Sequence, residues 1–182
     1  QSRGNRNVSS CEPCTSGFVC PEIAIVTPSM NCTAGYYCPG GQSSGTEFIC
    51  PEGHFCVAGS ASPQVCPAGQ FQNNTGQAQC QPCPGTTFCT MGTITPVDCP
   101  AGHYCPGRTQ YSTQYPCPTG TFSARTLLQS AAECSNCTGG MYCAKDGLQA
   151  PTGLCKSGYF CRTGVSVAAP VSNQLLGYAG GP

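Results

Sequence analysis

The sequence contains no tryptophan, has only 8% charged residues, and holds few of the apolar residues that normally fill a protein core. Leu, Ile, Val and Phe together account for 26 of its 182 residues. A domain of this length ordinarily buries a continuous apolar interior, and this composition cannot fill one. The sequence therefore excludes a large α/β or all-α enzyme domain.

Charge of either sign is scarce and unclustered. Seven basic and seven acidic side chains give a formal net charge of zero. The scattered Lys and Arg residues do not form the basic face that nucleic acid binding needs. No apolar run approaches the roughly 18 residues required to span a bilayer. We therefore expect no nucleic acid partner and no membrane insertion within this segment.

The chain is rich instead in cysteine, glycine and proline, with 19, 24 and 17 residues respectively. A cysteine content near 10% is typical of a disulfide scaffold, which persists in oxidising compartments such as the extracellular space. Four Asn-x-Ser/Thr sequons fit passage through the secretory pathway. We expect a secreted or extracellular protein that carries covalent glycans and no other cofactor, with N-glycosylation at Asn7, Asn31, Asn73 and Asn136.

A short motif, Cys-x-x-Gly-x-aromatic, recurs nine times with small departures. It defines nine repeats, numbered 1 to 9 below, which start at Cys14, Cys32, Cys50, Cys66, Cys83, Cys99, Cys117, Cys137 and Cys155. The glycine favours a turn that other residues resist. In repeat 5 it comes one residue early, at Gly85, so we expect that turn to differ. The residue five places after the Cys is expected to cover the disulfide and pack against the next repeat; it is Val19 in repeat 1 and then Tyr37, Phe55, Phe71, Phe88, Tyr104, Phe122, Tyr142 and Phe160.

These features predict a small disulfide-rich fold, irregular with short β-hairpins, arranged as an elongated linear array with almost no helix. Residues 1–13 are interpreted as the end of a preceding repeat, 14–164 as the tandem repeats, and 165–182 as a non-repeat tail or linker. Residues 124–132 are the only helix candidate. Nine units at about 10 Å each, the spacing of packed sheets, predict a rod of about 90 Å.

The repeats restrict how the cysteines pair. Seven repeats carry a second Cys six residues after the first, whereas repeats 4 and 7 lack it and carry Cys80 and Cys134 three residues before the next repeat. No repeat has both a Cys six residues after the first and a Cys three residues before the next repeat. We therefore favour a scheme in which each first Cys has one partner, within its own repeat. The local scheme is Cys14–Cys20, Cys32–Cys38, Cys50–Cys56, Cys66–Cys80, Cys83–Cys89, Cys99–Cys105, Cys117–Cys134, Cys137–Cys143 and Cys155–Cys161. A rival scheme that joins neighbouring repeats, as in Cys83–Cys99 with Cys89–Cys105, stays open.

Cys11 is left over. It lies three residues before repeat 1, the place that Cys80 and Cys134 hold in their repeats. We expect its partner to precede residue 1, which predicts that the chain is one stretch of a longer protein. A bond to another subunit and a free thiol are the alternatives.

No constellation of residues indicates catalysis or metal binding. The two histidines, His54 and His103, both follow the glycine of a repeat, and no acid recurs at a fixed offset from them. A nucleophile–base site therefore has no support. The Cys-x-x-Cys pairs are explained by the repeat and are too widely separated in the sequence to suggest a zinc site. We predict that the protein is not an enzyme and binds no metal.

The string Cys-Pro-x-Gly-x-Tyr/Phe, clearest in residues 66–83 and 99–105, resembles the ephrin-receptor-like cysteine-rich repeat. That repeat belongs to the broader group of growth-factor-receptor and tumour-necrosis-factor-receptor modules. The likeness covers about residues 11–164. Long arrays of this kind look like those of secreted and surface proteins of algae, ciliates and other protists, including flagellar-hair proteins. The resemblance implies an elongated extracellular rod without catalysis.

The sequence thus favours a structural subunit of an extracellular, glycosylated filament, surface hair, flagellar appendage or coat. Its expected partners are copies of itself or other chains of the assembly. The alternative is a rod-like ectodomain of a cell-surface receptor or adhesin that binds a protein ligand. Residues 22–26 (Glu-Ile-Ala-Ile-Val) are the candidate contact patch for that alternative.

Overall fold

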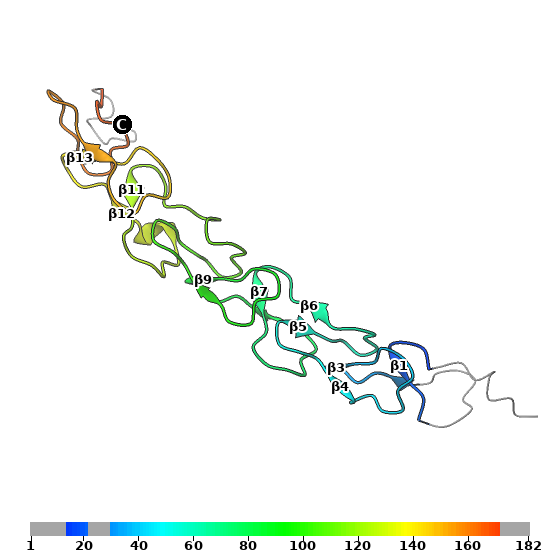
Figure 1. Cartoon of the computed structure of the whole chain (residues 1–182). Coiled ribbons are helices and arrows are strands. Elements are labelled where there is room, and N and C mark those ends of the chain that lie inside the picture. The colour runs from blue at the N-terminus through cyan, green and yellow to red at the C-terminus, as the bar shows by residue number, and fades with distance from the viewer. Residues whose placement is uncertain (1–13, 22–29, 172–182) are drawn as a thin grey trace, which may run out of the picture. The chain divides into compact units, whose positions relative to one another are not determined.

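A computed structural model describes residues 14–21 and 30–171. Within them the regular structure consists of two-residue strands and one short 3₁₀ turn, η2 (Ala131–Glu133). The strands form seven two-stranded sheets (Figure 1). The pairs are β1 (Phe18–Val19) with β2 (Met30–Asn31), β3 (Tyr36–Tyr37) with β4 (Phe48–Ile49), β5 (His54–Phe55) with β6 (Gln64–Val65), β7 (Gln70–Phe71) with β8 (Gln81–Pro82), β9 (Thr87–Phe88) with β10 (Val97–Asp98), β11 (Thr121–Phe122) with β12 (Ser135–Asn136), and β13 (Met141–Tyr142) with β14 (Gly153–Leu154).

Each hairpin corresponds to one repeat of the sequence. The first strand holds the residues four and five places after the first Cys of the repeat, and the second strand ends just before the first Cys of the next repeat. In repeat 3, for example, His54 lies opposite Val65 and Phe55 opposite Gln64 in antiparallel register. Repeat 6 has an isolated antiparallel bridge between His103 and Pro116 at the corresponding place. The period of the sequence is therefore the period of the hairpins.

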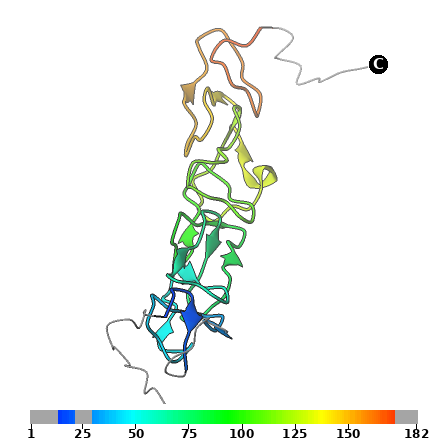
Figure 2. The same cartoon turned by 90° about the vertical axis from the view of Figure 1, so that its right-hand side faces the viewer.

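The chain divides into two compact blocks. The first consists of Gln1–Pro67, Phe71–Gln81 and Gly92–Ile94, and the second of Ala68–Gln70, Pro82–Met91 and Thr95–Pro182, apart from the residues outside the described ranges. The hairpins from β1 to β6 belong to the first block and those from β9 to β14 to the second. Figure 2 draws the same short strands in a second view. Both blocks are thus built from the same hairpin.

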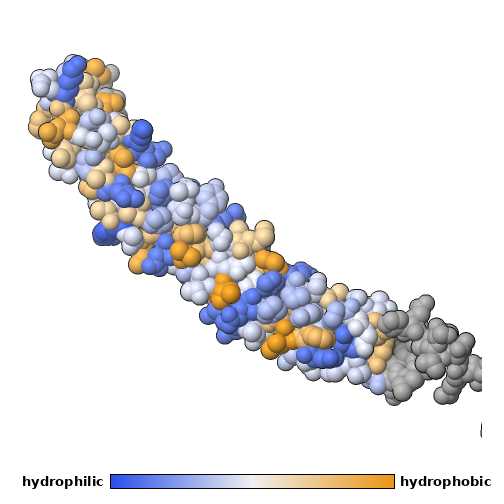
Figure 3. Space-filling model, in the orientation of Figure 1, coloured by the Kyte–Doolittle hydropathy of each residue, from blue (hydrophilic) through white to orange (hydrophobic). Residues whose placement is uncertain are grey.

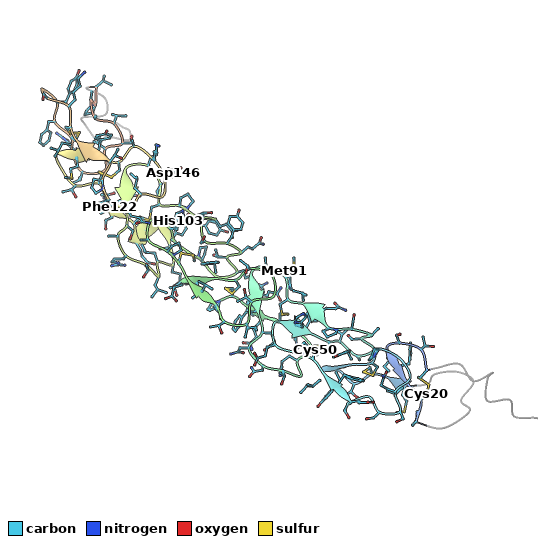
Figure 4. The ribbon with its side chains drawn as sticks, viewed as in Figure 1. Cys20, Cys50, Met91, His103, Phe122 and Asp146 are labelled. Atoms are coloured by element: carbon cyan, nitrogen blue, oxygen red, sulfur yellow. A yellow bond between two sulfur atoms is a disulfide. The ribbon has the colours of Figure 1, made fainter. Side chains whose placement is uncertain are left out.

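The structure forms the nine disulfides of the local scheme. Seven of them join cysteines six residues apart, and Cys66–Cys80 and Cys117–Cys134 span 14 and 17 residues. Figure 4 draws these bridges as yellow bonds and labels Cys20 and Cys50. The described residues contain no bridge of the rival scheme, since every cysteine from Cys14 onward already has its local partner. Cys11 lies outside the described residues.

Disulfides take the place of an apolar core. Fourteen cysteines are buried, whereas Val19, Leu128 and Val165 are the larger aliphatic side chains buried with them in the described part of the chain. Val19 packs with Cys32 and Cys38, and Leu128 packs with Cys117 and Cys134. The predicted fold class, small and disulfide-rich with short hairpins and almost no helix, is confirmed.

The helix candidate at residues 124–132 is wrong. Only η2, three residues long, is helical in this region. Leu127 takes a φ of +63°, which a right-handed helix cannot contain, and its N–H donates to the Cys99 carbonyl at 2.9 Å. Leu128 is then fully buried against the Cys117–Cys134 bridge. A contact to the preceding repeat and burial of Leu128 therefore override the local helix propensity.

Candidate functional site

Successive repeats are joined by backbone hydrogen bonds that start at the glycine of the motif, here called the motif glycine. Its N–H donates to the carbonyl of the residue at the second-Cys position of the next repeat. Its own carbonyl accepts from the first Cys N–H of that next repeat. In the first block, Gly35 bonds in this way to Cys56 at 2.8 Å and Cys50 at 2.9 Å. The next repeat therefore docks on a turn whose two polar groups both point towards it.

A second set of bonds runs from a turn later in each repeat. The residue at this turn, here called the turn residue, lies three or four places after the second-Cys position. In repeat 3 it is Gly59, whose N–H donates to the Cys32 carbonyl of repeat 2 at 2.9 Å. The next residue, Ser60, accepts from the Cys38 N–H at 2.9 Å. Four backbone hydrogen bonds thus join repeats 2 and 3, together contributing on the order of 4 kcal/mol.

The same four bonds recur in the second block between repeats 7 and 8. Gly120 bonds to Cys143 at 3.0 Å and to Cys137 at 2.8 Å, Gly147 donates to Cys117 at 2.8 Å, and Ser123 donates to Leu148 at 2.9 Å. None of these contacts depends on a side chain. Because backbone groups form these bonds, the surface side chains can differ from repeat to repeat without breaking the interface.

The motif glycines of six repeats, namely repeats 1 to 4, 6 and 7, also contact the repeat after next. A Cβ atom added to Gly53 of repeat 3 would lie 2.7 Å from the carbonyl oxygen of Gly92 in repeat 5. One added to Gly69 of repeat 4 would lie 2.6 Å from the Arg108 carbonyl oxygen in repeat 6. The motif glycines of repeats 1, 2, 6 and 7 meet the corresponding carbonyl still more closely. Glycine is needed here for close backbone approach as well as for its φ near +80°.

In repeat 5, Thr86 takes the place of the motif glycine. We predicted a different turn because Gly85 lies one residue early, and this is wrong. Thr86 itself adopts φ +73° and makes both bonds of a motif glycine, to Cys105 at 2.7 Å and Cys99 at 2.9 Å. The interface fixes the backbone at this position, so the threonine accepts an unfavourable conformation.

The two repeats without a second Cys bury a polar side chain in its place. Gln72 is 1% exposed, its Nε2 donates to the Gln79 carbonyl at 2.9 Å, and its Oε1 accepts from the Asn74 N–H at 3.1 Å. Ser123 bonds in the same way to both backbone groups of Arg125 at 3.1 Å. These side chains hold the longer loops that Cys80 and Cys134 close. The sequence pattern gave no sign of this role.

The predicted aromatic residues occupy equivalent half-buried positions in the repeats that follow repeat 1, except for Phe160 in repeat 9, which is 66% exposed. Two aromatic contacts lie within a single repeat. Tyr37 meets Phe48 with ring centroids 5.5 Å apart, and Tyr104 stacks on Tyr115 at 5.6 Å. Packing of these aromatics between repeats remains a prediction.

Three of the four predicted glycosylation sites lie in the described residues, and all three are exposed. Asn31 and Asn136 hold equivalent places at the end of a second hairpin strand, just before a first Cys, whereas Asn73 lies in the loop that Cys80 closes. Each is accessible to a glycan without unpacking a repeat. Asn7 lies outside the described residues, and glycosylation remains a prediction at all four.

Both histidines form hydrogen bonds with nearby backbone carbonyls. His54 Nδ1 lies 2.9 Å from the Glu52 carbonyl, and His103 Nδ1 lies 3.4 Å from the Ala101 carbonyl, so both bond to the backbone of their own turn. The described residues contain no cluster of His, Cys, Asp and Glu that could hold a metal ion. They also contain no helix long and apolar enough to cross a membrane.

Exposed apolar side chains are spread over many repeats. Figure 3 shows them as small separate groups between hydrophilic residues. The most exposed are Leu154 at 73%, Met91 at 71% and Phe160 at 66%. The patch at residues 22–26 that the receptor interpretation favours lies outside the described residues.

The predicted tail begins with residues that still contact the repeats. The Val165 carbonyl accepts from the Cys143 N–H at 2.9 Å, and the Ala168 carbonyl accepts from the Lys156 N–H at 2.8 Å. Val165 is 8% exposed. The backbone contacts thus continue to Ala168, and residues 172–182 lie outside the described ranges.

Nine disulfides that replace the apolar core point to an extracellular protein, because such bridges persist mainly in oxidising surroundings. No protein-family model matches the chain, and no curated protein matches its sequence.

Proposed function

We propose that the protein is a non-catalytic structural subunit of an extracellular, glycosylated filament, surface hair or coat, built from repeats of the ephrin-receptor-like type and assembling with copies of itself. The observation that carries this proposal is the interface between repeats. It uses backbone atoms at the same positions in both blocks, so one contact is repeated with little regard to side chains. A structural subunit needs this kind of regular, self-compatible contact.

The surface supports the same proposal. The formal net charge is zero, and low net charge favours association over repulsion between copies. The exposed apolar residues Met91, Leu154 and Phe160 lie in different repeats. They provide several small contact points in place of a single large ligand-binding patch. Glycans at the exposed asparagines would keep the remaining surface soluble.

The experiment is to produce the chain in an oxidising secretory host and follow its association with concentration. Sedimentation velocity gives the size distribution, and negative-stain electron microscopy gives the form of the assemblies. We expect ordered fibres or sheets at high concentration that dissolve on reduction of the disulfides. A single species of constant sedimentation coefficient at every concentration would refute the proposal and favour a monomeric receptor ectodomain.

A further inference from the structure

The few charges are segregated along the chain, although they form no compact cluster. No Lys or Arg occurs from residue 7 to residue 107, and this stretch contains five of the seven acidic residues. Residues 108–182 contain five of the seven basic residues and two acidic ones. We call the first stretch the acidic segment and the second the basic segment. Their formal net charges, −5 and +3, have opposite signs.

The basic segment presents cations at equivalent places in repeats 6, 7 and 8. Arg108, Arg125 and Lys145 each lie two or three residues after the second-Cys position, and all three are exposed. The corresponding turns of repeats 2 to 5 carry no charge. The turn residues of repeats 6 to 8 donate their N–H groups to the preceding repeat at 2.9, 2.9 and 2.8 Å. These three turns, here called the basic turns, therefore hold their cations on backbone that the interface between repeats fixes.

The acidic segment presents carboxylates on both sides of its exposed strands. Glu47, Glu52 and Asp98 are all exposed. Glu47 and Glu52 flank Ile49 in the sequence, and Asp98 follows Val97; both of these apolar side chains are exposed as well. The acids are therefore accompanied by apolar surface that a partner could cover.

The charges of the acidic segment and of the basic turns are not neutralised within the described ranges. None of these six side chains has a hydrogen-bond or ion-pair partner there. The two acids of the basic segment differ, because they bond to backbone near them. Asp146 Oδ1 accepts from the Thr119 N–H at 2.8 Å, and Glu133 Oε1 accepts from the Gln129 N–H at 3.3 Å. The cations of the basic turns thus remain available to an external acid.

We propose that the acidic segment of one copy docks on the basic turns of a second copy. The charges that face each other are Glu47, Glu52 and Asp98 on one copy and Arg108, Arg125 and Lys145 on the other. The exposed Tyr111 and Leu127 lie beside Arg108 and Arg125 in the sequence, so apolar surface is present on this side of the contact too. Because two different surfaces meet, the contact is heterologous and can be extended by further copies.

This inference rests on the proposed self-assembly and specifies the surfaces that meet. A second copy is the occupant that the charges favour, because it supplies both signs at once. A polyanion such as a sulfated polysaccharide would match the basic turns alone and would be repelled by the acidic segment. Exposed ion pairs are individually weak, so their main effect is to select which surfaces pair.

The first test compares two variants that raise the net charge equally. Glu47→Gln with Glu52→Gln removes two charges from the acidic segment. Ala124→Lys with Ala144→Lys, at exposed positions, adds two charges to the basic segment and is the control. Sedimentation velocity in about 20 mM salt is expected to give a dissociation constant about 2- to 30-fold higher for the Gln variant, from the loss of two exposed ion pairs, and no increase for the control. In about 500 mM salt the Gln variant and the wild type are expected to associate equally, because salt screens exposed charges.

The second test exchanges the charges between copies. Glu47→Lys with Glu52→Lys, and separately Arg125→Glu with Lys145→Glu, should each associate more weakly than the wild type when alone. An equimolar mixture of the two variants should recover association, because each reversed surface then meets a surface of opposite charge. Misfolded variants could not regain association on mixing, so recovery also shows that both variants are folded.

The outcomes separate the two proposals. If the wild-type chain assembles but the Gln variant assembles equally well in low salt, or if the control weakens assembly as much, the charged site is wrong while self-assembly stands. A mixture of the reversed variants that fails to recover association would also overturn the site. So would heparin binding that Arg125→Glu with Lys145→Glu abolishes while assembly of copies is unaffected, since the basic turns would then serve a polyanion. If the wild-type chain never assembles, the proposed function fails and the site falls with it.

Discussion

The contact between a repeat and the repeat after next makes a quantitative prediction at Gly102. Its φ is +81°, and its Cβ position lies against the carbonyl of Gly147, two repeats away. Gly102→Ala costs about 1–2 kcal/mol for an L-residue in the left-handed region. The clash with backbone also weakens the bonds of Gly102 to Ser123 and Cys117, at 2.8 and 2.9 Å. At about 0.5–1.5 kcal/mol for each bond, the total is about 2–5 kcal/mol.

Gly140→Ala is the matched control. Gly140 has φ +83° and makes the same two bonds, to Cys161 at 2.9 Å and Cys155 at 3.0 Å, but has no described atom within 4 Å of its Cβ position. This variant is expected to lose only about 1–2 kcal/mol of stability, from the backbone strain alone. The difference between the two substitutions, about 1–3 kcal/mol, isolates the contact across two repeats.

Amide hydrogen exchange measures this difference locally, without requiring a two-state transition of the whole array. The reporters are the amides of Cys117 and Cys155, which donate to the carbonyls of Gly102 and Gly140. Gly102→Ala should accelerate Cys117 exchange by about 5- to 150-fold more than Gly140→Ala accelerates Cys155 exchange. Equal accelerations would refute the argument that backbone approach, and not φ alone, requires glycine at this position.

Further predictions concern single repeats. Thr86→Gly should stabilise repeat 5 by about 1–2 kcal/mol by removing the strain at φ +73°, seen as slower exchange of the Cys99 amide; unchanged or faster exchange would contradict it. Leu128→Ala should destabilise the packing around it by about 2–5 kcal/mol in denaturant unfolding, since the side chain is fully buried; a loss below about 1 kcal/mol would count against this packing. Ser60→Ala should be neutral or stabilising in the same assay, because the buried Ser60 hydroxyl has no described partner, and a clear loss would indicate a hidden bond. Asn136→Gln should remove one glycan from the intact mass without affecting folding, and an unchanged mass would show that this sequon is not used.

The sequence by itself determined that disulfides replace an apolar core and that the structural unit repeats along the chain. Scarce Leu, Ile, Val and Phe ruled out an apolar core, and the exclusive choice between a second Cys and Cys80 or Cys134 indicated the bridges that the structure forms. Only the tertiary structure decided how repeats join. Their contacts run between backbone groups, which leave little trace in the sequence beyond glycine, and even glycine is dispensable where the interface forces Thr86 or Leu127 to positive φ. Disulfides depend on which side chains are present, so the sequence can indicate them. The hydrogen bonds between repeats depend on where the backbone lies, so only the folded chain reveals these bonds.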